Sequence, residues 1–341
     1  MILKLILYFL ILFSLSLIPY QEKYYTFFTP FYHKNMKKLD ENKHNYIHKT
    51  LNIGSLSEYS EYIKLLSKTI IKNTKILKVN ISKYKDENNI MSNLNNLTLD
   101  LIIIPRPTIY NYSNKYKNIR FVSNLNSSTF FMICNSNNII FKNHDLNIKK
   151  LPGKSIIGVS TDNLTNKTVT NNIISNIFNE DRFKYKYDSL LNLTNNIFDD
   201  DNEVNVITFI DSNPSKILTQ ILNKDIKNKI KIISIKQSDM NFDGDQTIYL
   251  QDYVKFKNYS QLNQYNTHET IYFFNVLLSN NNFSSDVIYN ILKLLNQDNT
   301  KKYLASNNIN NIHDIYVNKE PDIIVSHKGV NKFYGNKQKF L

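Results

Sequence analysis

The stretch that decides the fold class is Leu99-Asp100-Leu101-Ile102-Ile103-Ile104-Pro105-Arg106-Pro107. A short continuous apolar run that ends at proline is typical of a strand buried on both faces of a sheet. Upstream, the sequence predicts a strand at Leu51–Ile53 and a helix for which Ser55 is the N-cap. A strand at Ile76–Ile81 and a helix at Glu87–Leu97 complete the order strand, helix, strand, helix, strand. This order predicts an α/β fold with a parallel sheet covered by helices.

A second α/β unit begins near Thr129. Ile156–Val159 is predicted to be a strand that enters a polar turn at Ser160–Thr165, and a helix follows over about 167–178. Val204–Phe209 is predicted to be another buried strand. Ligands of open α/β sheets bind at the carboxyl ends of the strands. Two such units, each with polar turns after its strands, therefore predict a cleft lined from both sides.

The N-terminus begins with an apolar run from Ile2 to Ile18, interrupted by Lys4 and two serines and closed by Pro19. This length is about the minimum for a bilayer-spanning helix and exceeds most signal-peptide cores. We expect a signal peptide or transmembrane anchor over residues 1–19 and a linker or stalk over 20–49. The faces of the predicted N-terminal helix are uniformly apolar, so this helix should pack on nothing else in the chain. We expect the protein to lie outside a membrane, either exported or membrane-anchored.

Composition excludes several function classes. The chain has 341 residues, of which 42% are hydrophobic, so it can bury a core. Its formal charge is +13, but the lysines are scattered along the sequence without interleaved aromatics, which argues against a nucleic-acid groove. Cys134 is the only cysteine, which leaves no internal disulfide and no paired-cysteine metal site. We see no catalytic constellation or phosphate loop, and the one histidine pair at metal-ligand spacing, His44 and His48, falls in the predicted stalk. We therefore expect no enzyme activity, cofactor or metal.

Several local motifs and their order resemble the TAXI family, the solute receptors of a class of tripartite (TRAP) transporters. His327–Tyr334 is similar to that family's His-Pro-Gly-Ala-x-Arg-Tyr-Tyr signature, and Leu151–Gly158 to its Leu-x-Gly-Lys-x-Val-x-x-Gly segment. Asp100–Ile104 is similar to its Asp-Leu-Ala-Ile-Val strand, and Glu87-Asn88 matches the Glu-Asn that begins one of its helices. The resemblance covers the chain from Leu51 to Tyr334.

The resemblance implies a two-lobed, periplasmic-binding-protein-like fold of type II with discontinuous lobes and an N-terminal hydrophobic helix. Residues 50–128 and 258–341 would form lobe 1, and residues 129–257 would form lobe 2. It also implies a small, anionic, carboxylate-like or amino-acid-like solute and transporter membrane subunits as partners. The loops that contact solute in that family differ here, because Pro105-Arg106-Pro107, Tyr84-Lys85 and Thr161–Leu164 replace its motifs. Its glutamate-like specificity therefore does not transfer.

Six candidate ligand contacts lie in the predicted turns after strands: Ser55, Lys85, Arg106, Thr161, Asn163 and Thr165. Ser55 is either a helix N-terminus that faces a carboxylate or an ordinary N-cap. Arg106, held between two prolines, could grip an acidic ligand with both arms of its guanidinium, or could be a solvated loop arginine. Lys85 carries the least weight, because lysines occur throughout this chain. The three lobe 2 residues offer neutral hydrogen bonds or form a plain polar turn.

Three functions stay open from the sequence. The first is a solute receptor that closes its lobes on a small anion. The second is a structural or interaction protein that keeps the fold but has lost the ligand, which would fit the altered loops. The third is an enzyme on the same fold, for which the sequence offers no set of reactive residues.

Overall fold

The computed structural model describes residues 50–338 apart from positions 57–59, 75–77, 111, 113–114, 137–145, 163, 179–181, 200–202, 226–228, 241–247, 256–258, 260–266 and 307–323. The chain divides into two compact units, residues 1–50 with 74–78 and residues 51–73 with 79–341, and the second unit holds the fold described below. The predicted signal peptide or anchor over 1–19 and the stalk over 20–49 lie outside the described residues. No helix in the described part of the chain has both the length and the apolar character needed to cross a bilayer.

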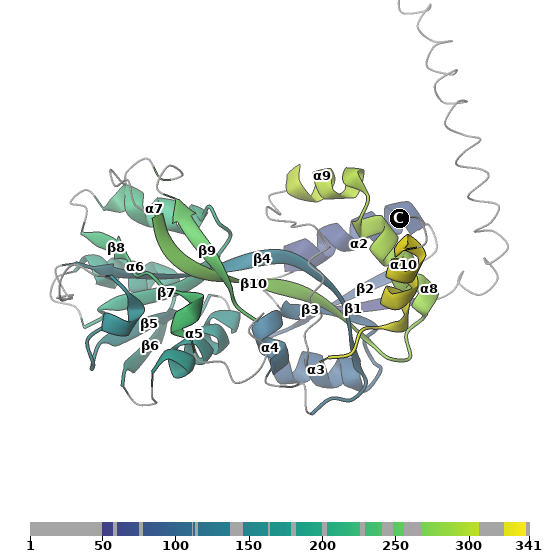
Figure 1. Cartoon of the computed structure of the whole chain (residues 1–341), viewed down its shortest axis with the longest axis horizontal. Helices are drawn as coiled ribbons and strands as arrows, with labels where there is room; N and C mark the ends of the chain where they lie inside the picture. Colours follow the sequence, from purple (N-terminus) through teal and green to yellow (C-terminus); the bar gives the residue numbers. More distant parts are fainter. Residues whose placement is uncertain are drawn as a thin grey trace, which may run out of the picture. The chain divides into compact units, whose positions relative to one another are not determined.

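One mixed sheet organises the second unit. Its main path runs β2-β1-β3-β10-β4-β7-β5-β6, with β8 paired to β4 and β9 paired to β10 (Figure 1). The strands are β1 (Thr50–Leu56), β2 (Lys78–Tyr84), β3 (Leu101–Pro105), β4 (Ile119–Asn135), β5 (Ile156–Ser160), β6 (Lys184–Asp188), β7 (Val206–Asp211), β8 (Ile230–Ile232), β9 (Leu250–Lys255) and β10 (Thr267–Asn280).

Helices connect and cover these strands. They are α2 (Ser60–Thr74), α3 (Glu87–Asn95), α4 (Arg106–Tyr110), α5 (Leu164–Ile177), α6 (Leu190–Phe198), α7 (Lys216–Lys224), α8 (Ser285–Leu295), α9 (Asp298–Ser306) and α10 (Lys328–Gln338). Three of them begin at side-chain N-caps, because Asp86, Ser189 and Ser215 each accept a hydrogen bond from the backbone N–H three residues later.

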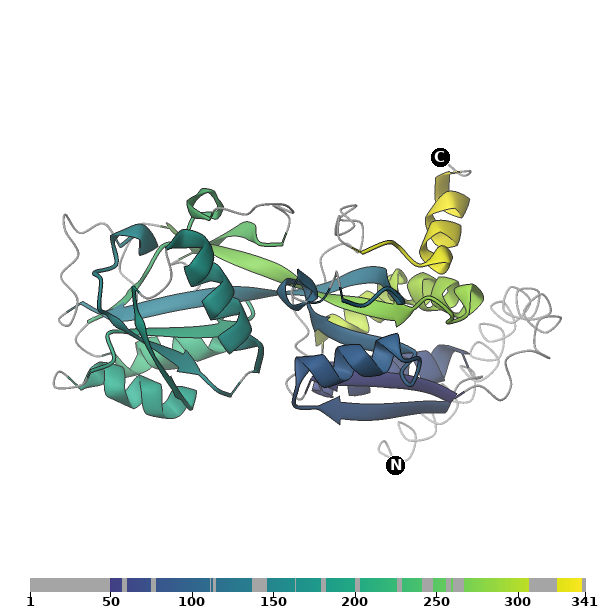
Figure 2. The same cartoon turned by 90° about the horizontal axis from the view of Figure 1, so that it is seen from below.

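The α/β class is confirmed, but the expectation of a parallel sheet is wrong in part. β1 pairs parallel with β3, and β5 pairs parallel with β6 and β7. Two long strands, β4 and β10, pair antiparallel with each other and with the parallel strands beside them. They run from the group β1–β3 into the group β5–β7, as Figures 1 and 2 show. The predicted boundary at residues 128 and 129 falls inside β4, and the one at 257 and 258 lies outside the described residues.

Local boundaries correct three expectations. Ser55 is not a helix N-cap, because β1 continues through Leu56 and the next helix begins at Ser60. Arg106 is not a solvated loop arginine, because it begins the short helix α4 directly after β3 and is buried. Thr165 lies in α5 rather than in a turn, since that helix begins at Leu164. In each case the boundary of an element differs from the one that the local pattern predicted.

Close packing around β1 and β5 explains why each of these strands contains a glycine. A Cβ added at Gly54 would lie 2.6 Å from Leu99 Cδ1, and one added at Gly158 would lie 2.8 Å from Leu193 Cδ2. Any larger side chain would therefore push the strand away from its neighbours. Gly54, which follows the predicted strand Leu51–Ile53, lies inside β1, where its small size lets neighbouring side chains approach closely.

Candidate functional site

The sheet has two places where its strand order reverses. In the order β2-β1-β3, the chain leaves β1 toward β2 on one side and returns to β3 on the other. In the order β7-β5-β6, it leaves β5 toward β6 and returns to β7 on the opposite side. Crossover helices then lie on opposite faces, and the carboxyl ends of the two adjacent parallel strands are left open for ligands. The two candidate positions are the ends of β1 and β3, and the ends of β5 and β7.

These two positions face each other across a short stretch of the antiparallel strands. Pro105, the last residue of β3, is the register partner of Asn275 on β10. Asp211, the last residue of β7, is the partner of Thr129 on β4, which in turn pairs with Tyr272 on β10. Three residues therefore separate the two levels along β10, roughly 10 Å at the rise of a β-strand. We call the region between these ends the central site.

The β1–β3 side of the central site contains a buried cation. Arg106 begins α4 and is 2% exposed, and it is among the largest fully buried side chains of the described chain. A guanidinium keeps its charge at every physiological pH, and burial of a charge is tolerated when other groups interact with it. Ser55 lies in register with Ile103, two residues before Pro105, so its fully buried hydroxyl projects from the same face as Asn275.

The floor of the central site is a polar segment within otherwise apolar strands. On β4, residues 123–129 read Ser-Asn-Leu-Asn-Ser-Ser-Thr between apolar neighbours, and most of these side chains are buried. Asn275 on β10 is fully buried and donates from Nδ2 to Ser128 Oγ at 3.1 Å. The Ser55 hydroxyl and the Oδ1 atoms of Asn126 and Asn275 have no hydrogen-bond partner among the described residues. Buried polar groups are normally hydrogen-bonded, which makes these atoms candidates for contact with a bound molecule.

The β5–β7 side of the central site is polar, but most of its hydrogen-bonding groups already pair with other groups of the protein. Asn166 Nδ2 donates to the carbonyls of Ser160 at 3.1 Å and Thr208 at 3.0 Å, which ties the ends of β5 and β7 together. Thr161 is exposed and its backbone N–H donates to the Asp188 carbonyl at 2.8 Å. Thr165 is fully buried in the first turn of α5. Asn163 lies outside the described residues.

Two carboxylates lie beside Thr129 at this end. Asp252 Oδ2 accepts from Thr129 Oγ1 at 3.0 Å and from Asn213 Nδ2 at 2.9 Å. Asp211 Oδ2 accepts from Ser215 Oγ at 2.7 Å and thereby helps to cap α7. Burial and the nearby Asp252 carboxylate raise the pKa of Tyr272, so its phenol stays protonated and available as a donor.

One carboxylate links the two sides. Glu87 begins α3, and its Oε1 accepts from Thr108 Oγ1 of α4 at 3.1 Å. Its Oε2 accepts from Thr168 Oγ1 of α5 at 3.4 Å, near the long limit for such a bond. Helices α4 and α5 also contact each other directly. The helix that carries Arg106 therefore touches the helix that carries Thr165.

Comparison with known proteins identifies the family of this chain. The profile of the NMT1-like family matches residues 106–337, well over half of the chain. The chain belongs to the NMT1-like family. The matched span begins at Arg106 and includes Asn275 and the β5–β7 end, whereas Ser55 and Lys85 precede it. The finer resemblance to TAXI receptors stays a prediction. No curated protein matches this NMT1-like sequence.

Solved structures show distant likeness to this NMT1-like protein. An ATP-bound protein of Xanthomonas citri has 10% identity and a TM-score of 0.47, covering 75% of this chain and 87% of its own. The binding protein component of an ABC phosphonate transporter from Pseudomonas aeruginosa has 15% identity and a TM-score of 0.43, covering 75% and 78%. A Candida albicans protein described as having the generic periplasmic binding protein fold has 14% identity and a TM-score of 0.43, covering 84% and 81%.

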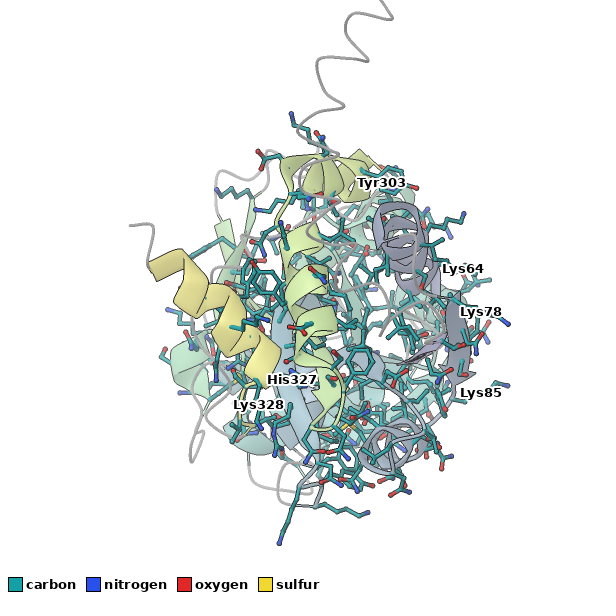
Figure 3. All side chains as sticks on the ribbon, turned by 90° about the vertical axis from the view of Figure 1, so that its right-hand side faces the viewer. Lys64, Lys78, Lys85, Tyr303, His327 and Lys328 are labelled. Atoms are coloured by element: carbon teal, nitrogen blue, oxygen red, sulfur yellow. The ribbon has the colours of Figure 1, made fainter. Side chains whose placement is uncertain are left out.

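The structure does not bring all six predicted residues of this NMT1-like chain together. Arg106 and Ser55 share the β1–β3 end, and Thr161 and Thr165 lie at the β5–β7 end. Lys85 lies in the bend after the edge strand β2, where it is exposed (Figure 3). Asn275 was missed by sequence reasoning, although the signal was present as a single amide inside the run Phe273–Leu278.

Metal ligands and surface grooves were the other candidates for a functional site. Within the described ranges, no group of three or more His, Cys, Asp or Glu residues is placed to hold a metal ion. A groove of about 480 Å³ lies between α6 and α7, lined by residues that include Leu191, Ile217 and Lys224. It lies against the outer helices of the β5–β7 group, and Asp162 is the residue it shares with the turn after β5.

Proposed function

We propose that this NMT1-like protein is a solute-binding protein of the periplasmic-binding-protein-like kind. In this proposal residues 50–128 with 258–341 and residues 129–257 form two lobes, and β4 passes from the first lobe into the second. A ligand that contacts both facing ends stabilises the closed arrangement, because it gains contacts that the open arrangement lacks. The observation that carries the proposal is the pair of facing strand ends with buried Arg106 at one of them.

The chemistry of the central site favours a small anion that also carries a hydrogen-bond donor. Arg106 suits a carboxylate or another planar, bidentate anion. The Asn275 and Asn126 amide oxygens accept hydrogen bonds and cannot donate them, so the ligand must supply an N–H or O–H group. A carboxylate or amino-acid-like solute meets both requirements. Thr161, Asn163 and Thr165 would contact it from the second lobe, and Ser55 from the first.

A thermal-shift screen of amino acids and carboxylates, followed by calorimetry on the hits, tests this function. Replacing Arg106 by Ala should weaken binding by about 2–5 kcal/mol, because the ligand's charge is left buried and unpaired. Replacing it by Lys should restore part of the affinity, since Lys has the charge without the planar fork. Arg182, exposed and stacked over Phe178, supplies the control, and R182A should leave affinity unchanged. Equal affinity for R106A and the parent protein would refute the assignment of Arg106.

A specific observation favours the alternative, a structural or interaction protein that has lost its ligand. Contact between α4 and α5, with the bond from Thr168 to Glu87, already joins the two sides without a solute. In that case no compound of the screen would raise the unfolding temperature, and R106A would lower stability without affecting any binding.

We further propose that the protein acts outside a membrane, tethered or delivered by residues 1–19, and that a transporter's membrane subunits receive its solute. The apolar N-terminal run and the resemblance to transporter receptors support this location. Fractionation of cells that express the full chain, with protease added to intact cells, tests it. A protein that stays soluble and protected inside the cytoplasm would contradict it.

A further inference from the structure

The lysines of α2 and β2 form an unusually basic part of the chain. Between Ser60 and Lys85 the sequence contains seven lysines and one carboxylate, Glu61, a net charge of +6 over a short segment. The whole chain reaches +13 over 341 residues. Positive charge is therefore several times denser here than elsewhere, and the composition bias toward lysine does not by itself explain the difference.

The fold gathers these lysines at one edge of the sheet. β2 is an edge strand, and side chains on both of its faces are exposed. Figure 3 shows Lys64 of α2, Lys78 at the start of β2 and Lys85 after its end along one side of the molecule. We call this surface the α2–β2 face and define it by five exposed lysines: Lys64, Lys68, Lys78, Lys83 and Lys85.

Exposed apolar side chains accompany the charge. Ile71 of α2 is 47% exposed and Ile81 of β2 is 37% exposed, and both lie among the lysines. In α2, Lys64, Lys68 and Ile71 recur at helical spacing on one face, while Ile63, Leu66 and Ile70 are buried. Asp86, which follows Lys85, is an exposed carboxylate at the margin of this surface.

We propose that the α2–β2 face docks on an anionic lipid surface. Lysines attract the negative surface potential of such a bilayer, and isoleucines beside them can enter the interfacial region. A single-stranded nucleic acid is less suited, because it requires aromatic platforms among the lysines, and the exposed large apolar residues of this face are aliphatic.

Flotation of the full-length protein with lipid vesicles tests the proposal. Vesicles of phosphatidylcholine alone are compared with vesicles that also contain phosphatidylserine, so that any contribution of the N-terminal apolar run to neutral lipid is subtracted. The test variant carries five surface substitutions, K64Q, K68Q, K78Q, K83Q and K85Q. The control variant removes the same charge from exposed lysines elsewhere, through K150Q, K154Q, K184Q, K216Q and K224Q.

Phosphatidylserine should raise the bound fraction of the parent protein and of the control variant. In the test variant this increment should fall about tenfold or more, because each lysine near an anionic surface contributes roughly a fivefold gain in partitioning. High salt should abolish the increment. Equal losses in the two variants would show a net-charge effect and overturn the proposal. Binding to an oligonucleotide that needs these lysines, without binding to vesicles, would also overturn it.

Discussion

At the scale of single residues, Asn275 is the position where the stability of the fold and the proposed solute binding favour different side chains. It is fully buried, donates to Ser128 Oγ at 3.1 Å, and its Oδ1 atom has no partner among the described residues. A buried unsatisfied amide oxygen costs about 1–3 kcal/mol, and an apolar residue of similar size removes that cost. N275L should therefore leave the free energy of unfolding within about 1 kcal/mol of the parent value while abolishing solute binding.

Asn280, the last residue of the same strand, is the matched control. Its Nδ2 donates to the Leu99 carbonyl at 2.8 Å and its Oδ1 accepts from Asn282 N at 3.1 Å. Because both groups are satisfied, N280L should leave buried partners unpaired and cost about 2–3 kcal/mol. Chemical denaturation of the two variants makes the comparison. An equal loss of stability in both would mean that Asn275 is an ordinary structural amide.

At the scale of elements, Glu87 couples three helices. It begins α3 and accepts hydrogen bonds from Thr108 of α4 and Thr168 of α5. E87A should lower stability by about 1–2 kcal/mol, because hydrogen bonds to a charged acceptor in a half-buried site are lost. It should also speed amide hydrogen exchange in α4 and in the first turns of α5, measured by mass spectrometry.

The neighbouring residue separates this coupling from a general weakening of α3. Asp86 is the N-cap of the same helix and accepts from Asn89 N at 2.9 Å. D86A should cost about 1 kcal/mol, as loss of a cap does, and should speed exchange within α3 alone. If D86A and E87A change exchange in α5 equally, then Glu87 does not link the two sides of the central site.

At the scale of the whole molecule, half-buried His268 and buried His327 make stability depend on pH. Burial, with a smaller effect from the charge of Lys231, lowers the pKa of His268 to about 4. Burial also lowers the pKa of His327. In the unfolded chain these imidazoles bind protons near pH 6.5, whereas in the folded chain they bind them only at lower pH. The free energy of unfolding therefore falls as pH drops from 6.5 toward 4. The His268 contribution to this loss should be about 2–3 kcal/mol.

Denaturant unfolding across this pH range measures the effect. H268Q removes the titrating ring, so its stability should fall less steeply between pH 6.5 and 4 than that of the parent protein. The slope that remains should include the contribution of His327. Parallel curves for the parent protein and H268Q would contradict the assignment of a half-buried neutral imidazole at this position.

The sequence by itself determined the class of fold and much of the helical structure. Apolar spacing predicted α2, α3 and α5 to within a few residues, because helix periodicity is a local property. The run that became β3 was identified in the same way, since it is buried on both faces. The family resemblance also led to the β1–β3 and β5–β7 ends, where Ser55, Arg106, Thr161 and Thr165 are found.

The tertiary structure alone decided how the strands pair and which polar groups meet. β4 and β10 are joined in the sheet across more than a hundred residues of sequence, and no local pattern shows their antiparallel direction or their register. The register with β3 places Asn275 beside Pro105, and at the register shift against β4 its side chain reaches Ser128 Oγ. It also turned Ser55 from a predicted helix cap into a strand residue, because pairing with β3 extends β1 past the point where local signals end it. Contacts between segments distant in the sequence thus decided the site, whereas contacts within a few residues had decided the elements.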